Sequence, residues 1–193
     1  MKILLPPCDA QRLHYVATMT TPGSADVNTR WPRAEIEEAL VAFQEAGVRA
    51  AETGDWSHFS ACFHEDADYI EHAYGTFHGR AEIHEWVTRT MGAFPGNVMT
   101  GFPMAWWVID EPTARVICEV RNVMPDPGDG SVHEESNLTI LTYGGDGLWA
   151  CEEDIYNPMR FAAMAQRWAA VAEQHGRLPA DGAAFVARLT RGR

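Results

Sequence analysis

The spacing of apolar residues in the first half of the chain predicts helices. Ile36, Leu40 and Phe43 recur at intervals of four and three, which places them on one face of a helix. This helix opens at Trp31-Pro32, because a proline at the first helical position lacks only an N–H that would be unpaired anyway. Gly54 is expected to end it.

Shorter elements follow this first helix. Asp55 can cap a short helix that runs to Ser60, and residues 69–72 form a β-prone segment. Gly75 and Gly79 then flank a turn and a brief return strand. From Arg80 the apolar spacing is helical again and ends near Pro95-Gly96.

The second half of the chain changes period and predicts a sheet. Short turn sequences, EPTA, PDPGDG and GGDG, separate four β-prone segments, which is typical of antiparallel hairpins. An alanine-rich helix over 159–176 then follows Asn157-Pro158 and stops at Gly176. The four segments span residues 104–110, 115–124, 132–143 and 148–157.

This order of elements indicates an α+β fold in which helices pack on the concave face of a curved antiparallel sheet. Such a sheet leaves a cone that suits a small apolar ligand. We expect residues 1–30 to be a flexible arm, 31–176 the domain, and 177–193 a tail or short helix. Met19 looks more like a natural start than Met1, so we expect 1–18 to be an extension without function.

Composition narrows the possible partners. The 193 residues carry 27 acidic against 15 basic side chains, a net charge of −12, which argues against nucleic acid and anionic membranes. The sequence contains no stretch of about 18 apolar residues, which is the length needed to span a membrane. Four scattered cysteines without a C-x-x-C motif are typical of reduced thiols, so we expect a cytoplasmic protein.

One segment resembles a known family. GDWSHFSACFHEDADY, followed by E-H-x-x-G-x-x-x-GR-x-x-I, is similar to SnoaL-like domains of the nuclear transport factor 2-like superfamily, over roughly residues 33–168. The resemblance implies a cone-shaped, cystatin-like α+β roll, related to ketosteroid isomerases, polyketide cyclases and limonene epoxide hydrolases. It also implies a homodimer formed through the sheet, whose two faces both carry apolar residues. The matching positions are Gly54, Asp55, Trp56, Phe59, Phe63, Asp66, Ala67, Gly79, Arg80 and Ile83.

The resemblance also indicates two catalytic carboxylates. Glu71 stands where ketosteroid isomerases carry their general base, and Asp154 stands where epoxide hydrolases of the limonene type carry an acid. An apolar cone raises a carboxyl pKa toward neutrality, which suits proton transfer. His72 should point to the opposite face of its strand from Glu71. His133 is a further acid/base candidate, although its place beside a turn favours exposure.

Epoxide hydrolysis and metal binding are less well supported by the residues. The arginine and aspartate that epoxide hydrolases place two apart on an inner strand are missing here, which makes that reaction less favoured. We expect no metal, because His72, His78 and His84 are spaced across a turn and nothing forces them to converge. We expect the substrate to contact residues drawn from Tyr69, Trp106, Asn122, Asn137 and Tyr156. Of these, Tyr69, Asn137 or Tyr156 should hold a developing oxyanion on it.

The sequence therefore predicts a cofactor-independent acid/base enzyme: an isomerase, a dehydratase (a lyase), a cyclase or a hydratase. Its substrate would be a small hydrophobic oxygenated molecule such as a steroid, terpenoid or polyketide. The alternative is a non-catalytic ligand-binding or assembly module whose cone is filled by its own side chains. An open apolar cavity with Glu71 or Asp154 at its end would favour catalysis.

Overall fold

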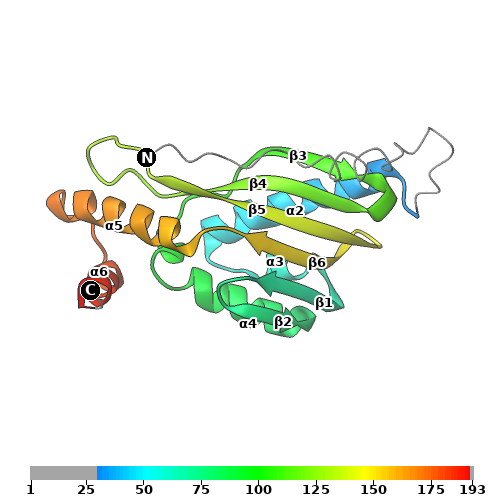
Figure 1. Ribbon diagram of the computed structural model, residues 1–193, viewed down its shortest axis with the longest axis horizontal. Helices are drawn as coiled ribbons and strands as arrows, with labels where there is room; N and C mark the ends of the chain where they lie inside the picture. The colour runs from blue at the N-terminus through cyan, green and yellow to red at the C-terminus, as the bar shows by residue number, and fades with distance from the viewer. Residues whose placement is uncertain (1–29, 192–193) are drawn as a thin grey trace, which may run out of the picture.

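The computed structural model describes residues 30–191, which form an α+β fold (Figure 1). The predicted arm over 1–30 falls almost entirely outside this range. The helices are α2 (Arg33–Thr53), α3 (Ser57–Ser60), α4 (Gly79–Met91), α5 (Pro158–Gln174) and α6 (Ala180–Arg191), with 3-10 turns η1 (Gly96–Val98) and η2 (Glu111–Thr113). The strands are β1 (Phe63–Glu71), β2 (Gly75–His78), β3 (Met104–Asp110), β4 (Arg115–Val123), β5 (Glu134–Gly145) and β6 (Leu148–Ile155).

The six strands form one curved sheet in the order β2-β1-β6-β5-β4-β3. The α+β class and the curved sheet are therefore confirmed. The sheet is mixed rather than wholly antiparallel, because β1 pairs with β6 in parallel. Parallel neighbours need a long connection between them, and here α4 and four strands separate β1 from β6 along the chain.

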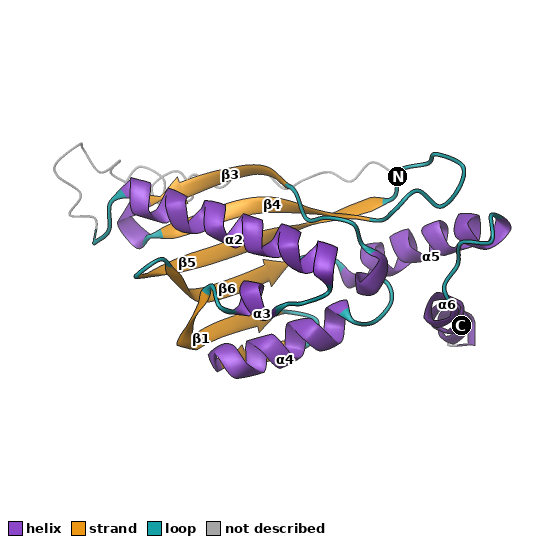
Figure 2. Cartoon of the chain, turned by 180° about the vertical axis from the view of Figure 1, so that it is seen from behind, coloured by secondary structure: helices purple, strands orange, loops and turns teal. Residues whose placement is uncertain are grey.

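Helices α2, α3 and α4 cover the concave face of the sheet (Figure 2). The predicted stripe on α2 is confirmed, since Ile36, Leu40 and Phe43 are all buried in the main core. The Phe43 ring lies 5.0 Å from Phe59 and 6.1 Å from Trp149, measured between ring centroids. Gly54 ends the helix as expected, with a φ of 73° that a residue with a side chain rarely adopts.

Strand β6 departs from simple alternation. In a regular strand, Trp149 and Glu152 would point to opposite faces. The pairing with β5 shifts between Thr142 and Tyr143, and the structure buries both Trp149 and Glu152 on the helix side. The irregularity lets β6 contribute an aromatic side chain to the core and acidic side chains farther along the same face.

The two C-terminal helices form a second layer of packing at one end of the sheet (Figure 1). The Asn157 side chain caps α5 by accepting a hydrogen bond from the Met159 N–H at 3.0 Å. The segment predicted as a tail or short helix contains α6. Both helices contribute to a separate apolar cluster around Trp168. No described helix has the length and apolar character needed to cross a membrane.

Candidate active site

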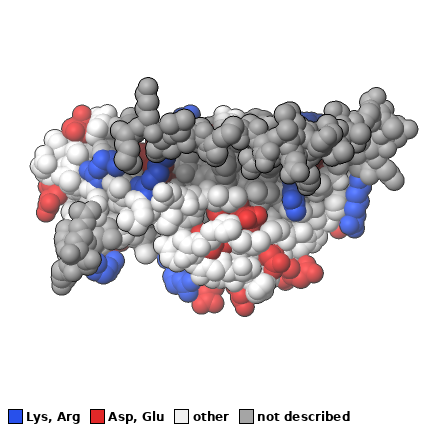
Figure 3. Space-filling view, in the orientation of Figure 1, with Lys and Arg blue, Asp and Glu red and all other residues white. Residues whose placement is uncertain are grey.

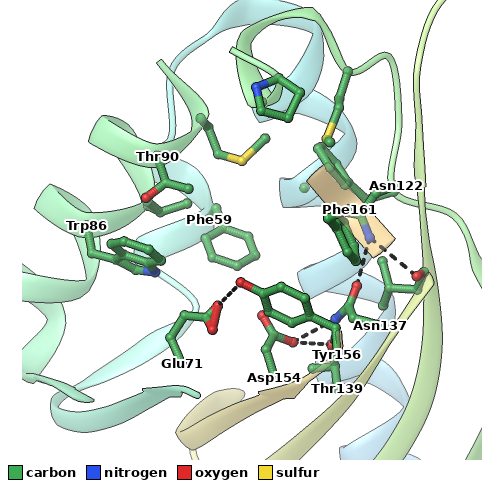
Figure 4. Close-up of a pocket in the computed structure, with 18 of the residues that line it drawn as sticks. Phe59, Glu71, Trp86, Thr90, Asn122, Asn137, Thr139, Asp154, Tyr156 and Phe161 are labelled. Carbon is green, nitrogen blue, oxygen red and sulfur yellow. Dashed lines mark hydrogen bonds between the residues drawn. The ribbon is translucent and has the colours of Figure 1, made fainter. Parts of the chain in front are cut away.

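A pocket of about 520 Å³ lies between the concave face of the sheet and the helices. Figure 4 shows Trp86 and Phe59 on one side of this pocket, with Glu71, Asp154 and Tyr156 along the sheet. Most of its lining is aromatic or aliphatic, so water inside it is poorly held and an apolar molecule would displace it at little cost. The polar groups that do enter the pocket are concentrated on the sheet.

Two carboxylates meet on this polar floor. Glu71 is the last residue of β1, and the strand register pairs it directly with Asp154 on β6. Paired residues on neighbouring strands point to the same face, and both side chains line the pocket. The sequence-predicted acids are thus brought together, although 83 positions of sequence number separate them, from 71 to 154.

Asp154 is held by three neutral hydrogen-bond donors. The Tyr69 hydroxyl donates to Oδ2 at 2.6 Å, while the Thr139 hydroxyl and the Asn137 amide donate to Oδ1 at 2.6 and 2.8 Å. Burial raises the pKa of Asp154, and these three donors act against that rise by stabilising the carboxylate. The side chain is consequently fixed in one orientation toward the pocket.

An amide chain behind Asp154 sets the orientation of Asn137. The Asn122 Nδ2 donates to the Asn137 Oδ1 at 2.8 Å, which leaves the Asn137 Nδ2 to face Asp154 and Thr139. Asn122 itself also donates to the Glu135 carbonyl oxygen at 3.2 Å. The predicted pair Asn122 and Asn137 therefore supports the acid, and both side chains also line the pocket.

Glu71 has a different environment. Its Oε1 accepts the Ala73 N–H at 3.0 Å, and its Oε2 accepts the Tyr156 hydroxyl at 2.9 Å. Burial is the main cause that raises the pKa of Glu71, and the negative charge of Asp154 raises it further. Because the charge of Asp154 acts on Glu71, we take Asp154 as the acid that ionises first.

A third acid in the pocket, Glu152, was not among the predicted site residues. It lies two residues before Asp154 on β6, is only 4% exposed, and its Oε2 has no hydrogen-bond partner among the described residues. Burial and the charge of Asp154 raise the pKa of Glu152 well above its usual range. The shared face of Glu152 and Asp154 on β6 was the signal that could have found it.

Three predicted residues lie away from the pocket lining. His72 follows Glu71 but points to the other face, where its Nε2 lies 2.8 Å from Glu153. His133 lies in the turn before β5, and its Nε2 is 2.9 Å from the Ser131 hydroxyl. Trp106 is 43% exposed, and its indole N–H donates to Glu119 on the convex face.

The predicted oxyanion donors already have acceptors. Tyr69 donates to Asp154 and Tyr156 donates to Glu71, so neither hydroxyl proton points freely into the pocket. Both Asn137 amide hydrogens also have acceptors, on Asp154 and Thr139. In this arrangement the three side chains orient the carboxylates. Among the described residues, no three His, Cys, Asp or Glu side chains are grouped so that they could hold a metal ion.

A curved sheet, helices on its concave face and an apolar pocket with acids on its floor define the nuclear transport factor 2-like class. A model of the SnoaL-like domain family matches residues 32–145, and the chain belongs to this family. No curated protein matches the sequence.

Solved structures agree on the fold. A putative isomerase from Bacillus subtilis is 16% identical with a TM-score of 0.55, over 67% of this chain and 94% of that one. An LEH-like epoxide hydrolase from M. tuberculosis is 15% identical with a TM-score of 0.54, over 76% and 95%. A putative polyketide cyclase from Xanthomonas campestris is 22% identical with a TM-score of 0.51, over 68% and 97%. At these identities the similarity extends to the fold and not to the reaction.

Proposed function

We propose that this protein is an acid/base enzyme that acts on a small, apolar, oxygenated molecule without help from a cofactor. The observation that carries the proposal is the register between β1 and β6, which sets Glu71 and Asp154 side by side on the floor of an apolar pocket. Isomerisation, dehydration, cyclisation and hydration all require one group that takes a proton and another that returns it.

The two acids differ enough to hold separate roles. Asp154 is the base, because three hydrogen bonds favour its ionised form. Glu71 is the acid, because burial and the nearby charge of Asp154 keep a proton on it to a higher pH. Asp154 takes a proton from the substrate or from a bound water, and Glu71 gives one to the oxygen where negative charge develops.

The pocket lining favours an uncharged substrate. The charge of Asp154 would repel a carboxylate or phosphate, and the one cationic side chain among the described lining residues, Arg89, is exposed. Aromatic side chains such as Trp86 and Phe59 provide flat apolar walls. A neutral ring system with one or two oxygen atoms, of the steroid, terpenoid or polyketide type, fits both features.

The alternative, a non-catalytic module, is supported less well. It expects a cone filled by the protein's own side chains, whereas a pocket of about 520 Å³ remains open between the sheet and the helices. A pure binding protein also gains nothing from burying several acids without cations beside them, because each costs free energy in an apolar pocket.

The test begins with the natural ligand. Mass spectrometry of the natively purified protein identifies a bound molecule, and its analogues are then screened for turnover. Glu71→Gln and Asp154→Asn keep the side-chain shape but cannot carry the proton, so each should lower turnover by roughly 10²–10⁴-fold. Folding should be preserved, because neither substitution opens a cavity.

Matched controls lie on the opposite face of the same two strands. Glu153→Gln on β6 and Asp68→Asn on β1 make the same chemical changes where the side chains contact His72 and His78 outside the pocket. Both should keep wild-type turnover. Wild-type turnover in both pocket variants would contradict the assigned roles.

We also propose that the protein forms a homodimer through the convex face of the sheet. Three apolar side chains, each about two-fifths exposed, lie in one row of paired positions across that face, with Glu119 between the first two: Trp106 at 43%, Leu138 at 39% and Ile155 at 42%. Figure 3 shows this face, where uncharged surface lies beside a group of acidic side chains.

Light scattering should give twice the chain mass of 21.5 kDa at micromolar concentration. Leu138→Lys should shift this mass toward that of the monomer, and a wild-type mass of one chain would contradict the proposal.

A further inference from the structure

The SnoaL-like family model ends at residue 145, before β6 and before the two C-terminal helices α5 and α6. These helices nevertheless form part of the pocket wall. Pro158, Phe161 and Ala162 of α5 line the pocket, as does Phe185 of α6. This part of the pocket wall therefore comes from a region of the chain that the family model does not include.

The helices are attached to the domain by side-chain contacts around this wall. The Trp168 indole N–H donates to the Pro125 carbonyl oxygen at 2.7 Å, and the Asn97 Nδ2 donates to the Asp181 carboxylate at 2.7 Å. The Arg177 guanidinium also donates to the Asp126 carbonyl oxygen at 3.0 Å. These anchors lie on α5, on the link between the helices and on α6, so the wall is held in place along its length.

Aromatic packing continues from the anchors into the pocket. Phe94, which follows α4, has its ring 5.8 Å from Trp168 and 5.3 Å from Phe185, measured between centroids. At the sheet, Phe161 packs edge-on against Tyr156 at 4.8 Å, and Tyr156 in turn donates to Glu71. Figure 4 shows Phe161 beside Tyr156 at the pocket. Two groups of rings thus join the C-terminal helices to the domain, and the second, Phe161 with Tyr156, reaches the proposed acid.

From this arrangement we propose that α5 and α6 set the length of ligand that the pocket accepts, with Phe161 and Phe185 as the specificity-determining residues. The inference rests on the proposed small-molecule pocket but not on the roles of Glu71 and Asp154. A ligand whose oxygen lies at the sheet extends its apolar part toward these two rings. Each added methylene that stays buried should improve the affinity about fourfold, until the chain meets the wall.

The experiment measures that limit directly. Straight-chain methyl ketones of increasing length compete with the uncharged fluorescent dye phenylnaphthylamine for the full-length protein. With the wild type, the affinity should rise about fourfold per methylene and then stop rising. Phe161→Ala and Phe185→Ala should let the rise continue to longer ketones, whereas Ala162→Leu should end it at shorter ones.

A matched control lies on the same helix. Ala170→Leu makes the identical change to Ala162→Leu on the exposed side of α5, and it should reproduce the wild-type limit. If a phenylalanine variant unfolds by circular dichroism, Ala162→Leu decides the question, because it removes no existing contact. The same limit in every folded variant would overturn the inference and leave the catalytic proposal standing.

The opposite failure is distinguishable. If the limit shifts as expected but Glu71→Gln and Asp154→Asn do not change turnover, the inference holds and the catalytic assignment fails. If the wild type binds neither the dye nor any ketone, the inference is overturned together with the pocket on which it rests.

Discussion

Glu152 gives the sharpest test of the electrostatics of the pocket. Its side chain is 4% exposed and its Oε2 lacks a hydrogen-bond partner among the described residues, while burial and the charge of Asp154 raise its pKa well above its usual range. The group should therefore be a neutral acid in the folded protein. On unfolding it regains its usual pKa of 4.5 and releases its proton at any higher pH.

The sign of the effect follows from proton binding. Above pH 4.5 the folded state holds a proton that the unfolded state has lost, so the free energy of unfolding falls as the pH rises. Each pH unit above this value should cost about 1.4 kcal/mol, until the pH reaches the pKa of the folded protein. Glu152→Gln keeps the shape and cannot ionise, so it is free of this loss.

The assay is urea unfolding of both proteins at several pH values and one fixed protein concentration. At pH 4 the two should agree within about 1 kcal/mol, because both carry a neutral, buried polar group. From pH 5 to 7 the variant should become progressively more stable than the wild type. Glu153→Gln, on the opposite face of β6, should follow the wild-type curve more closely. A difference between Glu152→Gln and wild type that is flat with pH, or of opposite sign, would refute the reasoning.

Three further predictions concern the site and the core. Turnover should have a bell-shaped pH profile, because it should fall at low pH as Asp154 becomes protonated and at high pH as Glu71 loses its proton. A flat profile would contradict both roles. Asn122→Leu should leave the Asn137 side chain free to turn, so that Asp154 loses a hydrogen bond that favours its ionised form. Turnover should fall by roughly tenfold, and the acidic limb of its pH profile should move to higher pH. An acidic limb that does not move would argue for a purely structural role of Asn122. Phe43→Ala should lower the free energy of unfolding in urea by about 3–5 kcal/mol, because Phe43 is 6% exposed and its ring packs against three aromatic rings. A loss below about 1 kcal/mol would contradict this, since it would mean that the core collapses into the cavity.

The sequence by itself determined most of the local structure. The α2 stripe, the stop at Gly54 and the four strands of the second half all lie where apolar spacing and turn residues place them. These features depend on residues that are close together along the chain, so the period of 3.6 or 2 is enough to predict them. Alternation likewise separates Glu71 from His72, and the structure places them on opposite faces of β1.

Only the tertiary structure decided which distant residues meet. The hairpin signals do not reveal that β1 lies parallel to β6, and yet this pairing is what sets Glu71 beside Asp154. Nor does alternation predict the shift in register after Thr142, which buries both Trp149 and Glu152 on the helix side. The local pattern of polar and apolar residues is the same whichever strand lies alongside.

The same limit applies to the wall of the pocket. Amphipathic spacing predicts α5, but not that Phe161 and Phe185 would line the same pocket as the acids. That position depends on anchors such as Trp168 to Pro125 and Asn97 to Asp181, which join parts of the chain far apart in sequence. Closing such long connections has an entropic cost that only the packing of the complete fold can offset, and for this reason short-range patterns do not record it.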